Sequence, residues 1–430
     1  MGRIKYIAAL ALAIACLPMV AQVNSPYSRY GYGLLNDRSQ GFNKGMGGVA
    51  YGIRGSQLLN TQNPASIAAI DSLTFLYDIG ASFQNGNFEE RGNKDNTRNT
   101  SLDYVTAGFR LAPRLGLYAT LRPFSTIGYS LTSTETIPAT PGVAAQTHTT
   151  IYKGEGAFNE VGLGFGWAPI KQLSLGAEAM YFWGDYSHTI ANTYSGSTAQ
   201  PTNRAYEAEM SSYRIGVGMQ YAFNVGKKHA LTLGAIYRFG HNINGDAMRV
   251  QRTLSGATTL TADTIKLNNA FAVPSTWGVG LSWMYNQRIR VAADYTKELW
   301  EGKRGVAEVN NSYVVTNGLY SNRSLLAVGA DFRGDPNGSR FKDHVIYRIG
   351  ASYATPYTKV NGYNGPKHYT VSAGVGLPIS NRFNTKNMIN LGVQWEHVKP
   401  SMPGMVTENY FRISIGLTFN ERWFMKWRVD

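Results

Sequence analysis

Apolar side chains alternate with small or polar side chains along many segments of this chain. In "HALTLGAIYRFG", Leu231, Leu233 and Tyr237 lie on one face of an extended strand, and Thr232 and Arg238 lie on the other. The same period of two recurs in "YRIGVGMQYAF", "NLGVQWEHV", "YFRISIGLTF" and "RIRVAADYT". Because this period is the signature of β-strands with unlike faces, the chain is expected to adopt an all-β fold.

About fourteen segments of this kind follow one another along the chain. Single-chain membrane barrels of bacterial outer membranes have an even number of antiparallel strands. The expected strands cover residues 72–85, 102–112, 115–133, 148–168, 172–192, 205–224, 229–250, 264–286, 288–302, 323–334, 344–361, 367–379, 387–399 and 409–424.

Composition helps to separate a membrane barrel from a soluble β-sandwich, which is the alternative. Charged residues make up 16% of the chain, below the roughly 25% of an ordinary globular domain. The chain has 47 Gly and 27 Tyr, and the less apolar face of its strands is rich in Gly and single charges. Trp167, Trp183 and Tyr237 lie toward strand ends, as in an interfacial aromatic belt. These features favour a transmembrane antiparallel β-barrel with a polar lumen.

The N-terminus has the features of an export signal. Arg3 and Lys5 precede an apolar run, and Ala21 is a small residue at a plausible cleavage point. Residues 1–21 are therefore predicted to be a signal peptide. Cys16, the only cysteine, lies inside it; lipidation of this residue is the alternative, which the position of Ala13 disfavours. We expect no disulfide or thiolate metal site in the mature chain.

The connections between expected strands alternate in kind. "APRL", "PIKQ", "NVGKK" and "NQR" are short, whereas "QNGNFEERGNKDNTRNT", "STETIPATPGVAAQ", "NTYSGSTAQPTN" and "GKRGVAEVNNSYVVTNGLYSN" are long and polar. Short turns of outer-membrane barrels face the periplasm and long loops face outward. The chain is therefore expected in the cell outer membrane, with both ends of the barrel domain (residues 72–430) on the periplasmic side.

Residues 22–71 precede the first expected strand, and two motifs in them resemble the N-terminal hatch of the FadL family. The first is the Gly-rich "KGMGGVAYG", and the second is the Asn-Pro-Ala of "NTQNPASIAAI". The matching residues are Gly45, Gly47, Gly48, Asn63, Pro64 and Ala65.

This resemblance implies a fourteen-stranded barrel whose lumen is plugged by residues 22–71. It also implies passive uptake of hydrophobic compounds, such as long-chain fatty acids, with release sideways into the membrane. The expected partners are a hydrophobic ligand, lipid or detergent in the lumen, together with outer-membrane lipids and lipopolysaccharide.

The stretch "NSPYSRYGYGLLND" departs from the fatty-acid transporters of this family. It is similar to a divergent branch with members associated with type IX secretion. The alternative function is therefore that of a plug or accessory subunit that carries no ligand and docks on a large secretion-pore barrel.

The stretch "LRPFSTIGYSL" has the composition of a strand, yet Pro123 lies within it. Proline has no N–H to donate and interrupts the ladder of a sheet. In the family that this chain resembles, the third strand bends inward and forms a lateral gate. The resemblance implies such a gate at Pro123, Phe124, Ser125 and Gly128; the alternative is a simple bend.

No catalytic, metal or cofactor site is expected. The seven His residues are scattered, without an HxxxH or HExxH pair. His241, Asn242 and Asp246 form the best place for a hydrolase site, but no Ser or paired carboxylate accompanies them at a recognisable spacing. We therefore expect that the protein is not an enzyme.

The net charge of +14 is expected to favour contact with anionic components of the membrane rather than binding of nucleic acid. Basic loops are expected to meet lipopolysaccharide. The "RGD" at 333–335 falls in an expected periplasmic turn, so adhesion through it is not expected. Inside the barrel, Arg214, Arg238, Arg348 and Arg412 are expected to pair with Glu178, Asp294, Glu396 or the hatch.

Overall fold

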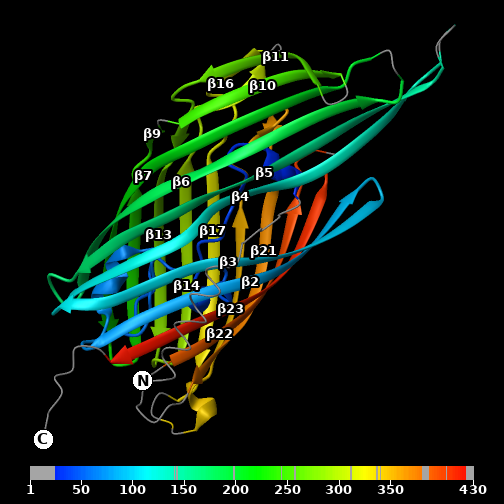
Figure 1. The fold of residues 1–430 in the computed structure, drawn as a ribbon. Coiled ribbons are helices and arrows are strands. Elements are labelled where there is room, and N and C mark those ends of the chain that lie inside the picture. Colours follow the sequence, from blue (N-terminus) through cyan, green and yellow to red (C-terminus); the bar gives the residue numbers. More distant parts are fainter. Residues whose placement is uncertain are drawn as a thin grey trace, which may run out of the picture.

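The alternating segments form the strands of one antiparallel sheet that closes on itself (Figure 1). β2 (Thr74–Glu90) pairs with β3 (Asn93–Ala112) on one side and with β23 (Thr407–Arg422) on the other, which closes the barrel. The computed structural model describes residues 25–422, apart from 140, 142–143, 197–198, 244, 256–257, 310–311, 336–337, 339, 380–386 and 403. The predicted signal peptide and Cys16 lie outside the described residues.

Seventeen strands belong to this sheet in the described chain, and fourteen positions make up its wall. β1 (Leu34–Leu35) is an addition from the N-terminal residues, while β8 with β10, and β11 with β13, each form one bent wall strand. The all-β barrel of fourteen strands is confirmed. The remaining wall elements are β4 (Leu115–Ile137), β5 (Gln146–Trp167), β6 (Leu173–Tyr194), β7 (Thr202–Val225), β8 (His229–Arg238), β10 (Gly245–Ser255), β11 (Thr258–Leu267), β13 (Ser275–Tyr285), β14 (Ile289–Leu299), β17 (Arg323–Arg333), β18 (Ile346–Ala354), β21 (Lys367–Ile379) and β22 (Asn387–Lys399).

The described chain also has short helices and strands that are not part of the barrel wall. None of the helices among the described residues is both long and apolar enough to cross a membrane. The additional elements are η1 (Pro26–Arg29), α2 (Gly41–Lys44), η2 (Pro64–Ala69), β9 (His241–Ile243), β12 (Phe271–Val273), β15 (Gly305–Val309), β16 (Ser312–Thr316), η3 (Phe341–His344), β19 (Lys359–Val360) and β20 (Tyr363–Asn364).

The two faces of the wall differ as the alternation predicts. On β7, Ile215 and Val217 are exposed on the outside, whereas Arg214 and Gln220 are buried in the interior. Apolar atoms therefore face the surroundings of the barrel, and polar side chains face its lumen. This arrangement is the reverse of a soluble sandwich and is that of a membrane barrel.

Two of the expected long loops are in fact partly strand. β2 and β3 continue pairing to Glu90 and Asn93, so the expected loop 86–101 is a hairpin that turns tightly at Arg91 and Gly92. The expected loop after β14 likewise contains the paired strands β15 and β16. Backbone pairing does not require apolar side chains, so ladders extend beyond the region where alternation is visible in the sequence.

The two ends of the barrel are unequal. Short connections at one end join β3 to β4, β5 to β6, β7 to β8 and β13 to β14. β2 also begins at this end, and β23 ends there. At the opposite end, β4 to β7 with β10 and β11 extend farther than their neighbours (Figure 1). We call the first end the short-turn end and the second the extended end.

Candidate functional site

The wall of the barrel is interrupted between β3 and β4. Their ladder runs from the short-turn end to the pair Val105 and Leu121, which is the last pair between the two strands. Beyond Leu121, β4 continues to pair with β5 as far as Ile137. Pro123 lies two residues past the last β3 partner, at the start of this unpaired edge.

β4 bends into the lumen directly after Pro123. Pro123 is opposite Asn159 and Ser125 is opposite Phe158, so Phe124 is the extra residue of a bulge. All six residues from 124 to 129 are buried, whereas a wall strand buries every second residue. Both faces of β4 are therefore covered here, and the strand leaves the surface of the wall.

The N-terminal segment (residues 25–71) occupies the free edge of β4. Leu34 and Leu35 of β1 pair with Thr126 and Ser125. Asn36 N donates to Phe124 O at 2.9 Å. The backbone of this segment thus takes the position that β3 holds nearer the short-turn end.

A second contact lies farther along the same edge. The Ser28 hydroxyl donates to Gly128 O at 3.1 Å, and Gly128 N donates back to Ser28 Oγ at 3.1 Å. The four residues assigned to the gate from the sequence, Pro123, Phe124, Ser125 and Gly128, therefore all lie on this edge of β4. The structure places all but Pro123 in contact with the N-terminal segment.

Tyr32 of the N-terminal segment lies at the centre of an aromatic cluster inside the barrel. Its hydroxyl donates to Ala272 O at 3.0 Å, and its backbone N–H donates to Tyr357 Oη at 3.2 Å. Burial raises the pKa of the Tyr32 hydroxyl well above its usual value, so this group stays neutral. The rings around Tyr32 are Phe124, Phe158, Phe182, Phe271, Trp300 and Tyr320.

Two guanidinium groups also lie over the ring of Phe124. Arg214 of β7 is 5.1 Å from the ring centroid, and Arg38 of the N-terminal segment is 5.7 Å from it. Burial, with Arg214 nearby, lowers the pKa of Arg38 to about 9. Both cations favour the ring face electrostatically, so they restrain Phe124. Sequence analysis identified Phe124 but missed Tyr32 and Arg38, whose only signal is the unusual stretch "SPYSRYGYGLLNDR".

A cavity of about 240 Å³ separates part of the N-terminal segment from the wall. Its lining is mixed in charge. Arg323 is 3.4 Å from Glu298, and Arg412 is 3.6 Å from Glu396. Phe124, Leu34 and Leu35 also line this cavity, so it combines ion pairs with apolar side chains at the free edge of β4.

The Gly-rich motif lies where the backbone of the N-terminal segment is close to the wall. A Cβ on Gly45 would lie 2.8 Å from Gly374 Cα, and one on Gly47 would lie 2.6 Å from Ala351 O. Gly47 and Gly48 also have φ values of +66° and +84°, which favour glycine. Gly47 N donates to Ser372 Oγ at 2.8 Å.

The Asn-Pro-Ala motif begins the helix η2. Asn63 is its N-cap and accepts from Ala65 N at 3.1 Å, and Pro64 occupies the first turn. The Asn63 amide also donates to Tyr51 O at 2.9 Å and to Met219 O of β7 at 3.2 Å. One side chain therefore links the helix start, the rest of the segment and the wall.

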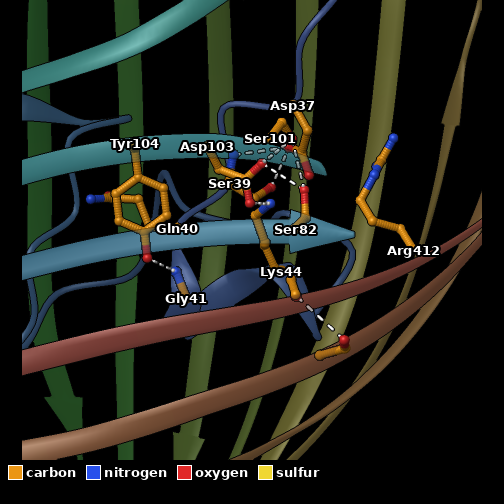
Figure 2. Close-up of polar contacts among 12 residues, drawn as sticks. Asp37, Ser39, Gln40, Gly41, Lys44, Ser82, Ser101, Asp103, Tyr104 and Arg412 are labelled. Carbon is orange, nitrogen blue, oxygen red and sulfur yellow. Dashed lines mark hydrogen bonds and ion pairs between the residues drawn. The ribbon is translucent and has the colours of Figure 1, made fainter. Parts of the chain in front are cut away.

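Helix α2 attaches the N-terminal segment to β3, as Figure 2 shows. Gly41 N donates to Tyr104 Oη at 2.6 Å, and Lys44 Nζ is 2.5 Å from Asp103 Oδ2. Asp103 has no opposite residue on β2, because the register shifts between Gly80 and Ala81. This bulge lets the Asp103 carboxylate reach a buried lysine.

The expected luminal ion pairs form only in part. Arg238 contacts Glu178 at 2.7 Å, and the Arg412–Glu396 contact also forms. Arg214 instead pairs with Glu160, which also receives Arg122 at 3.2 Å. Glu160 was not identified from the sequence, because its partners depend on the register of the sheet: Arg122 is opposite it on β4, and Arg214 lies two strands away on β7.

Two other expected pairings differ. Arg348 donates to Asn390 Oδ1 at 2.8 Å rather than to a carboxylate. Asp294 accepts from Ala50 N at 2.5 Å and Tyr51 N at 2.9 Å, so it contacts the N-terminal segment rather than an arginine.

His241 has a hydroxyl neighbour that sequence spacing did not reveal. Ser212 Oγ lies 2.8 Å from His241 Nε2, although 29 residues separate them. Asp246 is exposed on the outside of the extended end. Among the described residues, no three His, Cys, Asp or Glu side chains are grouped as metal ligands.

Solved barrel structures with the same fold are hydrocarbon channels. The Ralstonia pickettii toluene transporter TbuX matches with a TM-score of 0.59 at 14% identity, covering 90% of this chain and 100% of that chain. The CymD monoaromatic hydrocarbon channel matches with a TM-score of 0.59 at 14% identity, covering 90% and 99%. A Pseudomonas aeruginosa FadL homologue matches with a TM-score of 0.56 at 13% identity, covering 89% and 97%. At this identity the likeness establishes the fold.

Sequence comparison adds a family. None of the curated proteins compared with this chain matches it. The family model described as BamG matches residues 3–430, nearly the whole chain.

Proposed function

This chain belongs to the BamG family, and from that premise and its fold we propose that it is an outer-membrane channel for the passive uptake of hydrophobic compounds. The N-terminal segment is its hatch, and the interruption between β3 and β4 is its lateral exit. The observation that carries this proposal is the free edge of β4, which the hatch alone occupies at Ser125 and Thr126.

The descriptions of the structural neighbours support an apolar ligand. They are a toluene transporter and a monoaromatic hydrocarbon channel. In this chain the aromatic cluster around Tyr32 provides an apolar surface that extends to Phe124 at the exit. A ligand that displaces Tyr32 would therefore be adjacent to the free edge of β4.

The cavity beside the free edge of β4 is lined by Phe124 and Leu35 together with ion-paired residues, and this mixed lining bears on the direction of the path. Its ion-paired lining disfavours an apolar ligand, because such a ligand would desolvate the charges without replacing their hydrogen bonds. A hydrophobic compound would thus leave sideways past Phe124 rather than continue through the lumen. Release into the membrane is favourable by about 0.8 kcal/mol for each CH₂ that becomes buried, so no energy source is needed.

A reversible disulfide between the N-terminal segment and β4, here called a staple, tests the gate directly. Leu35 of the hatch is opposite Ser125 of β4. Opposite Cα atoms in antiparallel pairs lie about 4.5–5.5 Å apart, which is within the range of a disulfide. We expect Leu35→Cys with Ser125→Cys to abolish uptake of a radiolabelled long-chain fatty acid or of toluene when oxidised, and to restore it when reduced.

The matched control is a staple between Thr149 and Thr193, which are opposite each other on β5 and β6 away from the hatch. This control should leave uptake unchanged in both redox states. Equal uptake by the oxidised and reduced gate staple would reject the lateral exit. Absence of uptake in the wild type, with stable recovery of one large barrel partner in mild detergent, would instead favour the accessory subunit of a secretion pore.

A further inference from the structure

Four connections at the short-turn end carry six basic residues and no acidic residue. They are residues 110–116, 168–172, 225–229 and 285–288. Their cations, which we call the basic arc, are Arg110, Arg114, Lys171, Lys227, Lys228 and Arg288.

The basic arc is continuous around the wall. Its connections join eight neighbouring wall strands, from β3 to β14, in spatial order. Arg114 Nη1 donates to Pro169 O at 3.3 Å, which links the first two connections. Asn286 N donates to Lys228 O at 2.6 Å, which links the last two.

Four cations of the arc face the surroundings of the barrel. Arg114, Lys171, Lys227 and Lys228 are exposed. None of the six cations forms an ion pair with a carboxylate in the part of the chain that the structure describes. Their positive potential is therefore directed to the surroundings of the barrel.

The rest of the molecule differs from the arc. At the β17–β18 connection of the same end, Arg333 is 3.1 Å from Asp331, and Arg340 is 3.8 Å from Asp343. On β5 to β10, the outward-facing residues toward the extended end include five acidic ones, of which Glu155 pairs with Lys153 at 2.9 Å. These acidic residues are Glu155, Asp185, Glu207, Glu209 and Asp246.

Exposed apolar side chains border the arc on the side of the membrane-spanning wall. Leu111 is 56% exposed, Trp167 50%, Ile170 51% and Val225 49%. Apolar side chains next to long cationic ones suit a membrane interface, where the former contact acyl chains and the latter reach headgroups.

We propose that the basic arc binds anionic phospholipid headgroups of the phosphatidylglycerol class in the leaflet at the short-turn end. The arc follows the circumference, next to an apolar band, which fits a ring of lipids better than the compact contact of a protein. This inference rests on the proposed membrane location and not on transport. Each cation near an anionic surface contributes about a fivefold gain in binding.

The test uses the full-length protein in mild detergent with equal amounts of phosphatidylglycerol and phosphatidylcholine. Native mass spectrometry counts the lipids that each protein retains. The arc variant carries Arg114→Gln, Lys171→Gln, Lys227→Gln and Lys228→Gln. The matched control removes four exposed cations of the extended end, with Arg91→Gln, Lys94→Gln, Arg98→Gln and Arg252→Gln.

We expect the wild type and the control to retain phosphatidylglycerol preferentially. In the arc variant, the ratio of retained phosphatidylglycerol to retained phosphatidylcholine should be at least tenfold lower. Heat-modifiable gel mobility should show that all three proteins are folded. Equal lipid retention by all three would overturn the proposal. So would an arc variant that keeps its lipid but loses an acidic protein partner. Lipid selectivity without measurable uptake would reject the transport function alone.

Discussion

At the scale of single residues, a few side chains of the N-terminal segment, the hatch of the proposed function, connect it to the wall. Tyr32 contacts six other rings, and four of these belong to wall strands or to β12. Arg38 and Arg214 restrain Phe124 from two elements. These contacts connect the hatch, the aromatic cluster and the bulge of β4, so a change at one of them should affect the exit.

Tyr32→Ala should loosen the hatch. Loss of a fully buried aromatic side chain costs about 3–5 kcal/mol of stability. Most of this loss should destabilise the docked position of the N-terminal segment. We expect faster leak of a small hydrophilic dye from liposomes that contain the variant. Tyr32→Phe keeps the ring and loses only the hydrogen bond to Ala272, at about 1 kcal/mol, and should leak like the wild type. Equal leak by both variants would contradict a role for the ring.

At the scale of elements, two short segments determine how the hatch is attached. α2 contacts β3 through Lys44 and Gly41, and η2 contacts β7 through Asn63. β1 adds the pairing with β4. The hatch is therefore attached to β3 and β7 mainly by polar side chains, and to β4 by backbone pairing, the Ser28–Gly128 hydrogen bonds and the packing around Tyr32.

Asn63→Ala with Pro64→Gly should weaken the attachment by η2. The change removes an N-cap and two amide hydrogen bonds, each of about 1 kcal/mol, and adds backbone entropy to the undocked state. Dye leak should rise by about an order of magnitude. Asn224→Ala, at an exposed position near the end of β7, with Pro113→Gly in an exposed short turn, is the matched control. Unchanged leak in the first variant would show that η2 does not anchor the hatch.

At the scale of the whole molecule, the two ends of the barrel differ in length and in charge. The short-turn end has the basic arc, and the extended end has acidic residues on its outer surface. Since short turns of outer-membrane barrels face the periplasm, the extended end should lie outside the cell.

Cysteine labelling checks this orientation. The only native cysteine is Cys16, in the predicted signal peptide. After removal of that peptide, an introduced cysteine would be the only one that reacts with the label. Arg91→Cys at the extended end should react with a membrane-impermeant maleimide on intact cells. Lys227→Cys at the short-turn end should react only after the outer membrane is permeabilised. The opposite pattern would invert the assignment of leaflets, including that of the basic arc.

The strand number and the membrane-facing surface could be predicted from the sequence, because alternation is a local property of each strand. The alternation of Leu231 and Leu233 with small or polar residues is visible in the sequence itself. The register between β8 and β13 then places these apolar side chains on one side of the wall. The motif residues Asn63 and Gly47 were also visible, since caps and left-handed turns have local signatures.

Only the tertiary structure shows which separate segments meet. The pairing of Glu160 with Arg122 and Arg214, the ring contacts of Tyr32 and the approach of Ser212 to His241 all join residues far apart in the chain. Pro123 is the clearest case. Its missing N–H is a local fact, but the last β3–β4 pair at Leu121 and the pairing of β1 with Ser125 depend on the closed barrel. A proline interrupts a ladder in any sheet, and the path of the neighbouring strands decides whether another segment occupies the free edge.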